Sequence, residues 1–302
     1  MAILQLFVFI GFAPFLSGLI TKIKNNIRMR EGQSILQPYY NLAKLCSKEE
    51  VVSESASWIF RVTPFVVFSS TLAAALLIPV FIFYSPAHYM GDFLALIFIF
   101  ALGRFFLALA ALDTGSSFGG MGSSREMFIA SLVEPALCLA VFSLNLESGS
   151  TDILAFSGIH KISLSCVVAA VALFLITLAE TSRIPVDNQE THLELTMVHE
   201  AMALEYSGKS LALLEMAFYI KQMVYFFLIA QIIFPIVIPG FLNLAQLFFW
   251  FIWYLVRIII IVISVALVEV TVAKMRLFRV ADFLGFAFVL GVIATVCAML
   301  GV

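Results

Sequence analysis

Long runs of apolar residues dominate the chain, and short segments that carry most of the charges separate them. A helix needs about 20 mostly apolar residues to cross a hydrocarbon core of about 30 Å. Eight runs meet this length, and none shows the two-residue alternation of membrane strands. We therefore predict an all-α integral membrane protein, a single polytopic domain over residues 1–302 with spans at about 2–22, 62–84, 93–112, 127–146, 162–182, 211–238, 244–268 and 281–301.

Lys and Arg are distributed unevenly between the connecting segments. The segments after the first, third, fifth and seventh spans hold thirteen basic residues, whereas those after the second, fourth and sixth hold only Lys161. Basic loops stay on the cytoplasmic side of a membrane. We therefore predict that both termini lie outside and that the long loops, at about 22–61 and 183–210, lie in the cytoplasm.

Composition excludes several classes of function. Hydrophobic residues make up 63% of the chain and charged residues 12%, about half the share usual in soluble domains. The net charge is −2 and no basic, aromatic-interleaved stripe occurs, so we expect no nucleic-acid partner. The four cysteines are isolated, which predicts neither an iron–sulfur cluster nor a disulfide framework in this chain. Any electron transfer would then occur on a partner.

Seven charged residues stand within the apolar runs or at their edges, where each costs about 2.5–3.5 kcal/mol on insertion scales. They could form structural ion pairs between helices, for example Glu215 with Lys221 or Glu269 with Arg257. For the whole set, a polar path through the helix bundle is the better interpretation. The seven are Arg104, Glu134, Glu180, Glu215, Lys221, Arg257 and Glu269.

Glu134 precedes Pro135, which cannot donate a backbone hydrogen bond and leaves a carbonyl near Ser131 without its usual partner. A carboxylate beside an unwound, hydratable stretch is suited to proton relay, since desolvation raises its pKa toward neutrality. The alternative is a kink beside a locally satisfied acid.

Acidic residues are densest just after the fifth predicted span. If this segment is helical, Glu190 and Glu194 share a face and their repulsion raises the pKa of one. His192 and His199 add groups that titrate near neutral pH, so the segment could pass or store protons. An ordinary solvated acidic loop is the alternative. The six carboxylates are Glu180, Asp187, Glu190, Glu194, Glu200 and Glu205.

Two motifs that suggest other chemistry fail on inspection. The stretch 199–203 begins like HExxH, but Ala203 stands where the second zinc ligand is needed. The spacing of His192, Glu194 and His199 fits no helical face well, so we predict no metal site. The glycine-rich stretch 115–122 lacks the Lys-Ser/Thr of a phosphate-binding loop, and we interpret it as a tight turn that allows close packing.

Four segments in order, at residues 28–45, 115–135, 179–187 and 204–208, resemble the quinone-site membrane subunit of respiratory complex I. Within that family, residues 112–116, 124–126 and 273–277 look more like the branch of formate hydrogenlyase and membrane-bound [NiFe] hydrogenases. Glu31, Gly32 and Gln33 depart from a common Gly-Pro pair, and the stretch 196–204 looks longer than in quinone-reducing members. The first departure affects the backbone shape near a quinone mouth, and the second favours a branch that does not reduce quinone.

The resemblance implies an acidic route from the redox module into the membrane arm, lined by Glu134, Glu180, Asp187, Glu190, Glu194 and Glu205. Together with the other titratable groups above, the candidate proton route comprises Glu134, Glu180, Asp187, Glu190, Glu194, Glu205, Glu215, Lys221, His192 and His199. The resemblance also implies that Arg28, Arg30, Lys44 and Arg183 lie under the docked soluble subunits. We expect no catalytic residue in this chain.

The implied partners are a hydrogenase-like large subunit, a small iron–sulfur subunit and antiporter-like membrane subunits, in a bacterial or archaeal cytoplasmic (inner) membrane. Iron–sulfur clusters, and a [NiFe] centre where the large subunit retains one, would belong to these partners. The leading hypothesis is a non-catalytic subunit that couples electron transfer to proton or sodium translocation. A quinone-chamber subunit and a stand-alone ion transporter are the alternatives.

Overall fold

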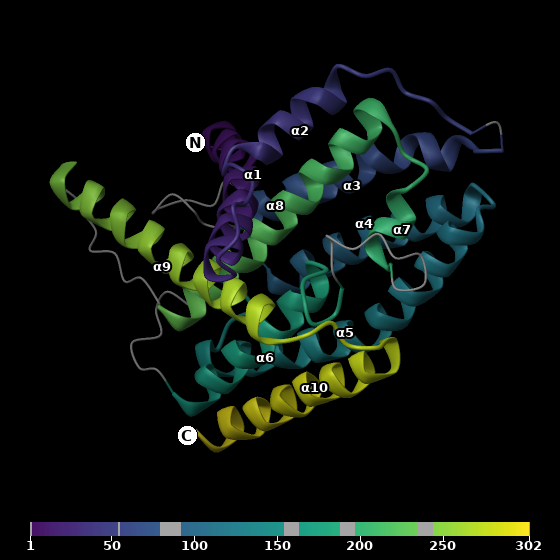
Figure 1. Ribbon diagram of the computed structural model, residues 1–302. Coiled ribbons are helices and arrows are strands. Elements are labelled where there is room, and N and C mark those ends of the chain that lie inside the picture. Colours follow the sequence, from purple (N-terminus) through teal and green to yellow (C-terminus); the bar gives the residue numbers. More distant parts are fainter. Residues whose placement is uncertain are drawn as a thin grey trace.

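The computed structural model describes residues 2–53, 55–78, 92–153, 163–187, 197–234 and 244–301. Apart from an isolated bridge between Asp92 and Asp152, the regular structure in these ranges is helical. The helices, shown in Figure 1, are α1 (Ala2–Ile27), α2 (Gln37–Cys46), α3 (Trp58–Leu77), α4 (Phe93–Asp113), α5 (Ser117–Ser148), α6 (Leu164–Glu180), α7 (His199–Ala203), α8 (Gly208–Ile233), α9 (Leu244–Thr271) and α10 (Leu277–Leu300).

Seven of these helices are long and apolar enough to cross a membrane, namely α1, α3, α4, α5, α8, α9 and α10. They confirm the prediction of an all-α, multi-pass membrane protein. The fifth predicted span, 162–182, corresponds to α6, which has only 17 residues and a length of about 26 Å. It is shorter than predicted because Ser163 caps its start and Ser182, with φ 51°, leaves the helical conformation at its end.

Polar side chains fix where several helices begin. In the first turns of α3, α4 and α5, one backbone N–H donates to the side chain of Ser57, Asp92 and Ser116, respectively. These N–H groups have no acceptor within the helix itself. As a result, α5 begins at Ser117, ten residues earlier than the predicted span, and most of the glycine-rich stretch is helical. The expected turn is confined to the residues around Gly115 (φ 66°).

The predicted unwinding beside Pro135 is not observed. Helix α5 continues through this proline from Ser117 to Ser148. A proline removes one backbone donor, and the remaining hydrogen bonds of a 32-residue helix hold the conformation on both sides of it. Glu134 therefore lies in the middle of an unbroken membrane helix.

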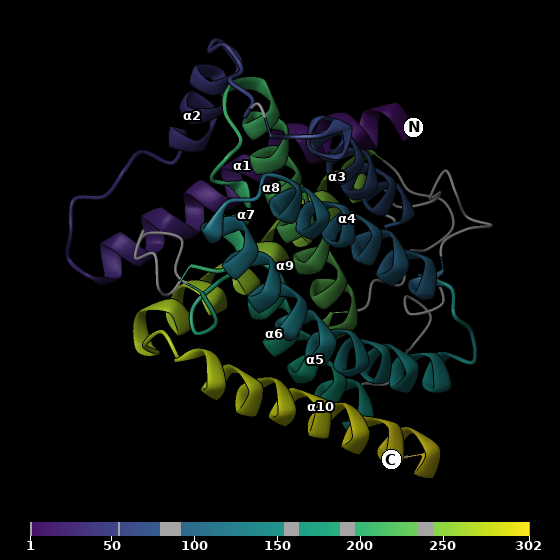
Figure 2. The same cartoon turned by 90° about the vertical axis from the view of Figure 1, so that its right-hand side faces the viewer.

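Small side chains let the helices of one side of the bundle approach closely. Ala136, Ala140, Ala169 and Ala172 are fully buried where α5 packs against α6 and α10. Such residues are typical of helix interfaces in membranes, where close backbone packing replaces the hydrophobic effect. Figures 1 and 2 both show α10 running along the edge of the bundle beside α5.

The short helix α7 occupies a central position. It packs against α5 and α4, although the segment that contains it was predicted to be a cytoplasmic loop. Figure 2 shows α7 close to α4, α5 and α8, whereas α2 lies at the periphery in both views. Helix α7 is thus part of the bundle and brings His199 and Glu200 with it.

Candidate functional site

Four charged side chains from four membrane helices form a buried ion-pair chain, which we call the central chain. Nη2 of Arg104 in α4 lies 2.7 Å from Oε1 of Glu180, the last residue of α6. Nζ of Lys221 in α8 lies 2.7 Å from the second oxygen of Glu180. Nη1 of Arg104 lies 3.3 Å from Oε1 of Glu134 in α5. Two acids and two bases therefore alternate without net charge.

The two ends of the central chain differ in exposure. The side chain of Glu180 is 2% exposed and that of Lys221 is 11% exposed. Glu134 is 42% exposed, although it lies near the middle of a membrane helix. The chain thus runs from the interior of the subunit to its lateral surface.

A second buried cluster joins α1, α9 and the end of α6. The Glu269 carboxylate oxygens lie 3.1 Å from Nζ of Lys24 and 3.2 Å from Nη1 of Arg183. Arg183 also donates through Nη2 to the oxygen of the Gln222 side chain at 3.0 Å and to the Ser17 hydroxyl at 3.3 Å. One carboxylate is therefore shared by two buried cations.

Asp187 fixes the start of α7. One carboxylate oxygen accepts from the backbone N–H groups of Val198 (3.2 Å) and His199 (3.4 Å), and the other lies 2.7 Å from Nζ of Lys274. A carboxylate at a helix N-terminus satisfies amides that have no partner within the helix. Asp187 therefore connects α7 to the segment between α9 and α10.

A cavity of about 320 Å³ lies between α7, α8 and the end of α6. Its lining includes Glu180 and Lys221, and hence one end of the central chain. Gln222 also lines it, and its amide nitrogen is buried and has no hydrogen-bond partner within the described residues. Buried polar atoms of this kind are usually satisfied by ordered water. The other titratable groups around the cavity are His199, Glu200 and Glu215.

The environment of α7 shifts two of these groups. Burial, helped by the charges of Asp187 and Glu215 and opposed by Lys274, raises the pKa of Glu200 to about 7. Burial lowers the pKa of His199 below its ordinary value. Around neutral pH, Glu200 can both accept and release a proton, while His199 is mainly neutral.

The structure brings together most of the described residues that we predicted for the proton route. Glu134, Glu180 and Lys221 form the central chain with Arg104, while Glu215 and His199 line the cavity and Asp187 supports it. Glu205 is half-buried and is not among the residues that line the cavity. The predictions for Glu190, His192 and Glu194 concern positions outside the described residues.

Both illustrative ion pairs are wrong. Glu215 and Lys221 are six residues apart on α8, about 240° around the helix, so they project from different faces. Glu269 and Arg257 are about 18 Å apart along α9. Arg257 instead donates to the carbonyl of Phe234 at the end of α8, and its guanidinium lies 4.9 Å from the ring centroid of Tyr254.

The basic residues predicted to dock the redox module occupy two environments. Arg30 and Lys44 are exposed, and Arg28 is half-buried, with one guanidinium nitrogen 3.1 Å from the backbone carbonyl oxygen of Glu269. Arg183 is only 5% exposed because the chain turns into the bundle directly after α6. Its expected place under the docked subunits stays a prediction, and its charge contributes to the second cluster.

Sequence reasoning missed Lys24 and Lys274 as site residues, because both were counted only as basic loop residues. The pattern of α1 held a usable signal for Lys24. Leu16, Ile20 and Lys24 are spaced four residues apart and are all buried, so Lys24 continues the inward face of α1. The position of Lys274 gave no comparable signal, since its partner Asp187 is 87 residues away.

The fold and the site define a class of protein: a polytopic membrane subunit with charged side chains paired inside its helix bundle. The family model described as NADH dehydrogenase matches residues 1–300. The chain therefore belongs to the NADH dehydrogenase family of membrane subunits, which confirms the resemblance found in its motifs.

Relatives and a solved structure agree with this assignment. Hydrogenase-4 component C of Escherichia coli (strain K12) is 34% identical over 292 residues, covering 95% of this chain and 92% of that protein. Formate hydrogenlyase subunit 4 of the same organism is 34% identical over 227 residues, covering 74% and 73%. NADH-quinone oxidoreductase subunit 8 of Rhodothermus marinus is 26% identical, covering 70% and 66%.

The fold is also found in a solved structure of the membrane-bound sulfane sulfur reductase, an archaeal respiratory membrane complex. The similarity has a TM-score of 0.83 at 20% identity and covers 98% of this chain and 99% of that chain. The relatives are thus components or subunits of larger enzymes, and the solved structure is that of a respiratory membrane complex.

Proposed function

We propose that this chain is a non-catalytic membrane subunit of a hydrogenase-type respiratory complex, which anchors a soluble redox module in the cytoplasmic membrane and couples its electron transfer to ion translocation. The single observation that supports this most directly is the central chain. Its four side chains lead from a cavity to the lateral surface through the membrane interior. Enclosing three of these charges in the helix bundle is costly, and a structural anchor would not require it.

The alternation of acids and bases suggests how the route works. At rest, each buried charge of the central chain is balanced by a neighbour. A proton that enters the cavity and neutralises Glu180 leaves Lys221 and Arg104 with an excess positive charge. This excess favours loss of a proton from a titratable group further along the route, toward the lateral surface. Charge displacement in the redox module would act on the cavity through Asp187 and α7.

The exposure of Glu134 supports a membrane partner. A charged group facing lipid near mid-bilayer is costly, so functional carboxylates in spans usually face protein or water. With 42% of its side chain exposed, Glu134 needs a neighbour to cover it. We propose that an antiporter-like subunit covers this surface and receives the proton, while the hydrogenase-like large subunit and the small iron–sulfur subunit dock near Arg30 and Lys44.

The lining of the cavity favours coupling over quinone reduction. A quinone chamber predicts a long apolar tunnel between α1 and the segment after α6. The described lining of the cavity instead comes from residues between Glu180 and Gln222, including acids and bases, and includes no residue of α1. Charged side chains in this wall are a poor match for a long isoprenoid tail.

The test begins with the complex purified from its native membrane in mild detergent, with its subunits identified by mass spectrometry. Reconstituted in liposomes, the complex is then assayed for ions translocated per electron in the wild type, Glu180→Gln and Asp282→Asn, a change on the exposed surface of α10. We expect Glu180→Gln to lose translocation while Asp282→Asn retains it. Recovery of the chain alone, or unchanged translocation in Glu180→Gln, would contradict the proposal.

A further inference from the structure

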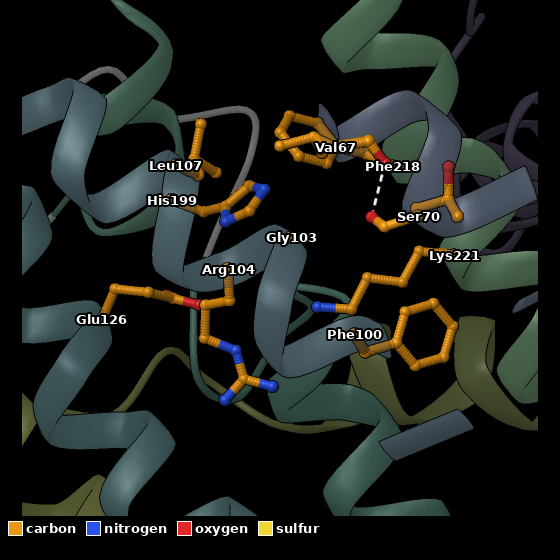
Figure 3. A pocket seen from close by; sticks show the side chains of 11 residues that line it. Val67, Ser70, Phe100, Gly103, Arg104, Leu107, Glu126, His199, Phe218 and Lys221 are labelled. Atoms are coloured by element: carbon orange, nitrogen blue, oxygen red, sulfur yellow. Dashed lines mark hydrogen bonds between the residues drawn. The ribbon is translucent and has the colours of Figure 1, made fainter. Parts of the chain in front are cut away.

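A small pocket lies beside the large cavity and shares one wall with it. Its volume is about 20 Å³, enough for one water molecule, which needs about 10–15 Å³. The shared wall consists of His199, Phe218 and Lys221, whereas Glu126 of α5 borders only the small pocket. Figure 3 shows Glu126 and His199 entering the pocket from one side and Lys221 from the other.

His199 has an unmet polar requirement in this place. Its Nδ1 is buried and has no hydrogen-bond partner among the described residues, and its ring packs edge-on against Phe218 with centroids 4.1 Å apart. An unsatisfied buried nitrogen destabilises the fold, and a hydrogen bond from a water molecule in an adjoining pocket would remove this cost. The Glu126 carboxylate likewise makes no direct hydrogen bond or ion pair with described side chains.

The neighbouring groups are suited to holding such a water. The hydroxyls of Ser70 and Thr71 donate to carbonyls of their own helix, at 2.8 and 2.9 Å, so their lone pairs remain available to accept from the pocket. Gly103 keeps the space open, because a Cβ atom at this position would lie 2.6 Å from the Ser70 hydroxyl oxygen.

The position of His199 beside Glu126 is fixed from three directions. Asp187 accepts from the backbone N–H of His199. Arg125 donates to the carbonyl of Met197 at 2.8 Å. Gly122, one turn before Glu126, lets α7 approach α5 so closely that a Cβ atom there would lie 2.8 Å from Cβ of Ala201. A pocket held by this many contacts is a built feature of the fold.

We infer that Glu126 and His199 exchange a proton through one water molecule in this pocket, and that Glu126 is a further residue of the proton route. A protonated Glu126 gives its proton to the water as the water gives one of its own to the ring nitrogen of His199. Only O–H and N–H bonds form and break in this step. His199 then passes a proton into the large cavity, where Glu200 and Glu180 lie.

Charged groups surround the ring on every packed element. They are Arg104 on α4, Glu126 on α5, Glu180 on α6 and Lys221 on α8, while Asp187 acts through the backbone of α7. The acids stabilise the imidazolium, whereas burial and Lys221 oppose it, so the charged ring is a transient carrier. Glu126 is only half-buried and lies near the start of α5, which gives the route an entrance separate from the cavity.

This inference rests on the proposed function, and its test separates the two. Ions translocated per electron are measured in the reconstituted complex for Glu126→Gln, Glu126→Asp, His199→Gln and Gly103→Ala, with Asp282→Asn as the matched surface control. We expect Glu126→Gln and His199→Gln to lower the ratio at least about tenfold, as removal of a proton-transferring group does. Glu126→Asp should retain more than half of it.

Gly103→Ala keeps both titratable groups and narrows the pocket, so it should lower the ratio in the same way. If the Glu126→Gln variant fails to assemble, Gly103→Ala still tests the proton exchange between Glu126 and His199. Wild-type ratios in Glu126→Gln or in Gly103→Ala, combined with a lost ratio in Glu180→Gln, would overturn this inference and leave the proposed function standing. If Glu180→Gln also kept the wild-type ratio, the proposed function itself would fail. A high-resolution map of the intact complex should show one water between Glu126 and His199, and an empty pocket would refute it.

Discussion

The second buried cluster allows a sharp prediction, because one carboxylate serves two cations. Glu269 is 2% exposed and pairs with Lys24 at 3.1 Å and Arg183 at 3.2 Å, whose side chains are 5% and 6% exposed. Glu269→Gln would leave both cations buried against a neutral amide. Removing one partner of a buried pair costs about 3–5 kcal/mol, so we expect a loss at the upper end of this range.

Lys24→Met is the matched comparison, because it removes one cation and leaves Glu269 paired with Arg183. We expect a loss of about 1.5–3 kcal/mol, the usual size for a hydrogen bond to a charged group. In the double variant, Lys24→Met should partly compensate for Glu269→Gln by removing one of the two cations that contact residue 269.

Equilibrium unfolding in mixed detergent micelles with increasing dodecyl sulfate, followed by tryptophan fluorescence, measures these differences. Asp282→Asn is the surface control and should change the free energy of unfolding by less than about 0.5 kcal/mol. A Lys24→Met variant that is as unstable as Glu269→Gln, or a double variant with the sum of both losses, would refute the reasoning.

Three further predictions concern other parts of the molecule. Glu200→Gln should be as stable as the wild type at pH 5 and more stable than the wild type at pH 8. The pKa of Glu200 is raised in the folded state, so ionisation of this carboxyl destabilises the folded state as pH rises toward about 7. An equal pH dependence of the free energy of unfolding in both proteins would contradict this. Arg257→Met should lower the free energy of unfolding by about 1–3 kcal/mol because the Phe234 carbonyl loses its donor, with Ser264→Ala, at a half-buried position of the same helix, as the control. Equal stabilities of Arg257→Met and the wild type would argue against a stabilising role for this hydrogen bond. Exposed Cys46 should react with a membrane-impermeant maleimide in inverted vesicles stripped of their soluble subunits, but not in intact cells. Buried Cys166 should react in neither, and labelling of Cys46 in intact cells would reverse the predicted orientation.

The spans were predictable from the sequence because a hydrocarbon core imposes one length on every crossing, whatever the other contacts of the helix. The start of α5 could not be predicted. Ser116 caps this helix, and the glycines that follow it are helical where α5 packs closely against α4 and α7. The intramembrane charges were also predictable, because a charged residue within a long apolar run is rare and is recognised directly in the sequence.

Pairing of these charges could not be predicted, because the partners are far apart in the sequence. Arg104 meets Glu180 across 76 residues and Arg183 meets Glu269 across 86. Nothing in the local pattern selects these partners over Lys221 for Glu215 or Arg257 for Glu269. The return of the segment after α6 into the bundle was hidden for the same reason, since its polarity resembles that of an ordinary loop and its burial depends on Asp187 and Lys274.

The half-exposed Glu134 also has a consequence for biosynthesis. A newly inserted copy of the chain would present this carboxylate to lipid until a neighbouring subunit arrives, although Arg104 compensates part of its charge from within. An unassembled copy is then chemically distinguishable from an assembled one by this uncovered carboxylate. We expect membrane proteases to remove such orphan copies, so that the abundance of this chain in the cell follows that of its neighbour.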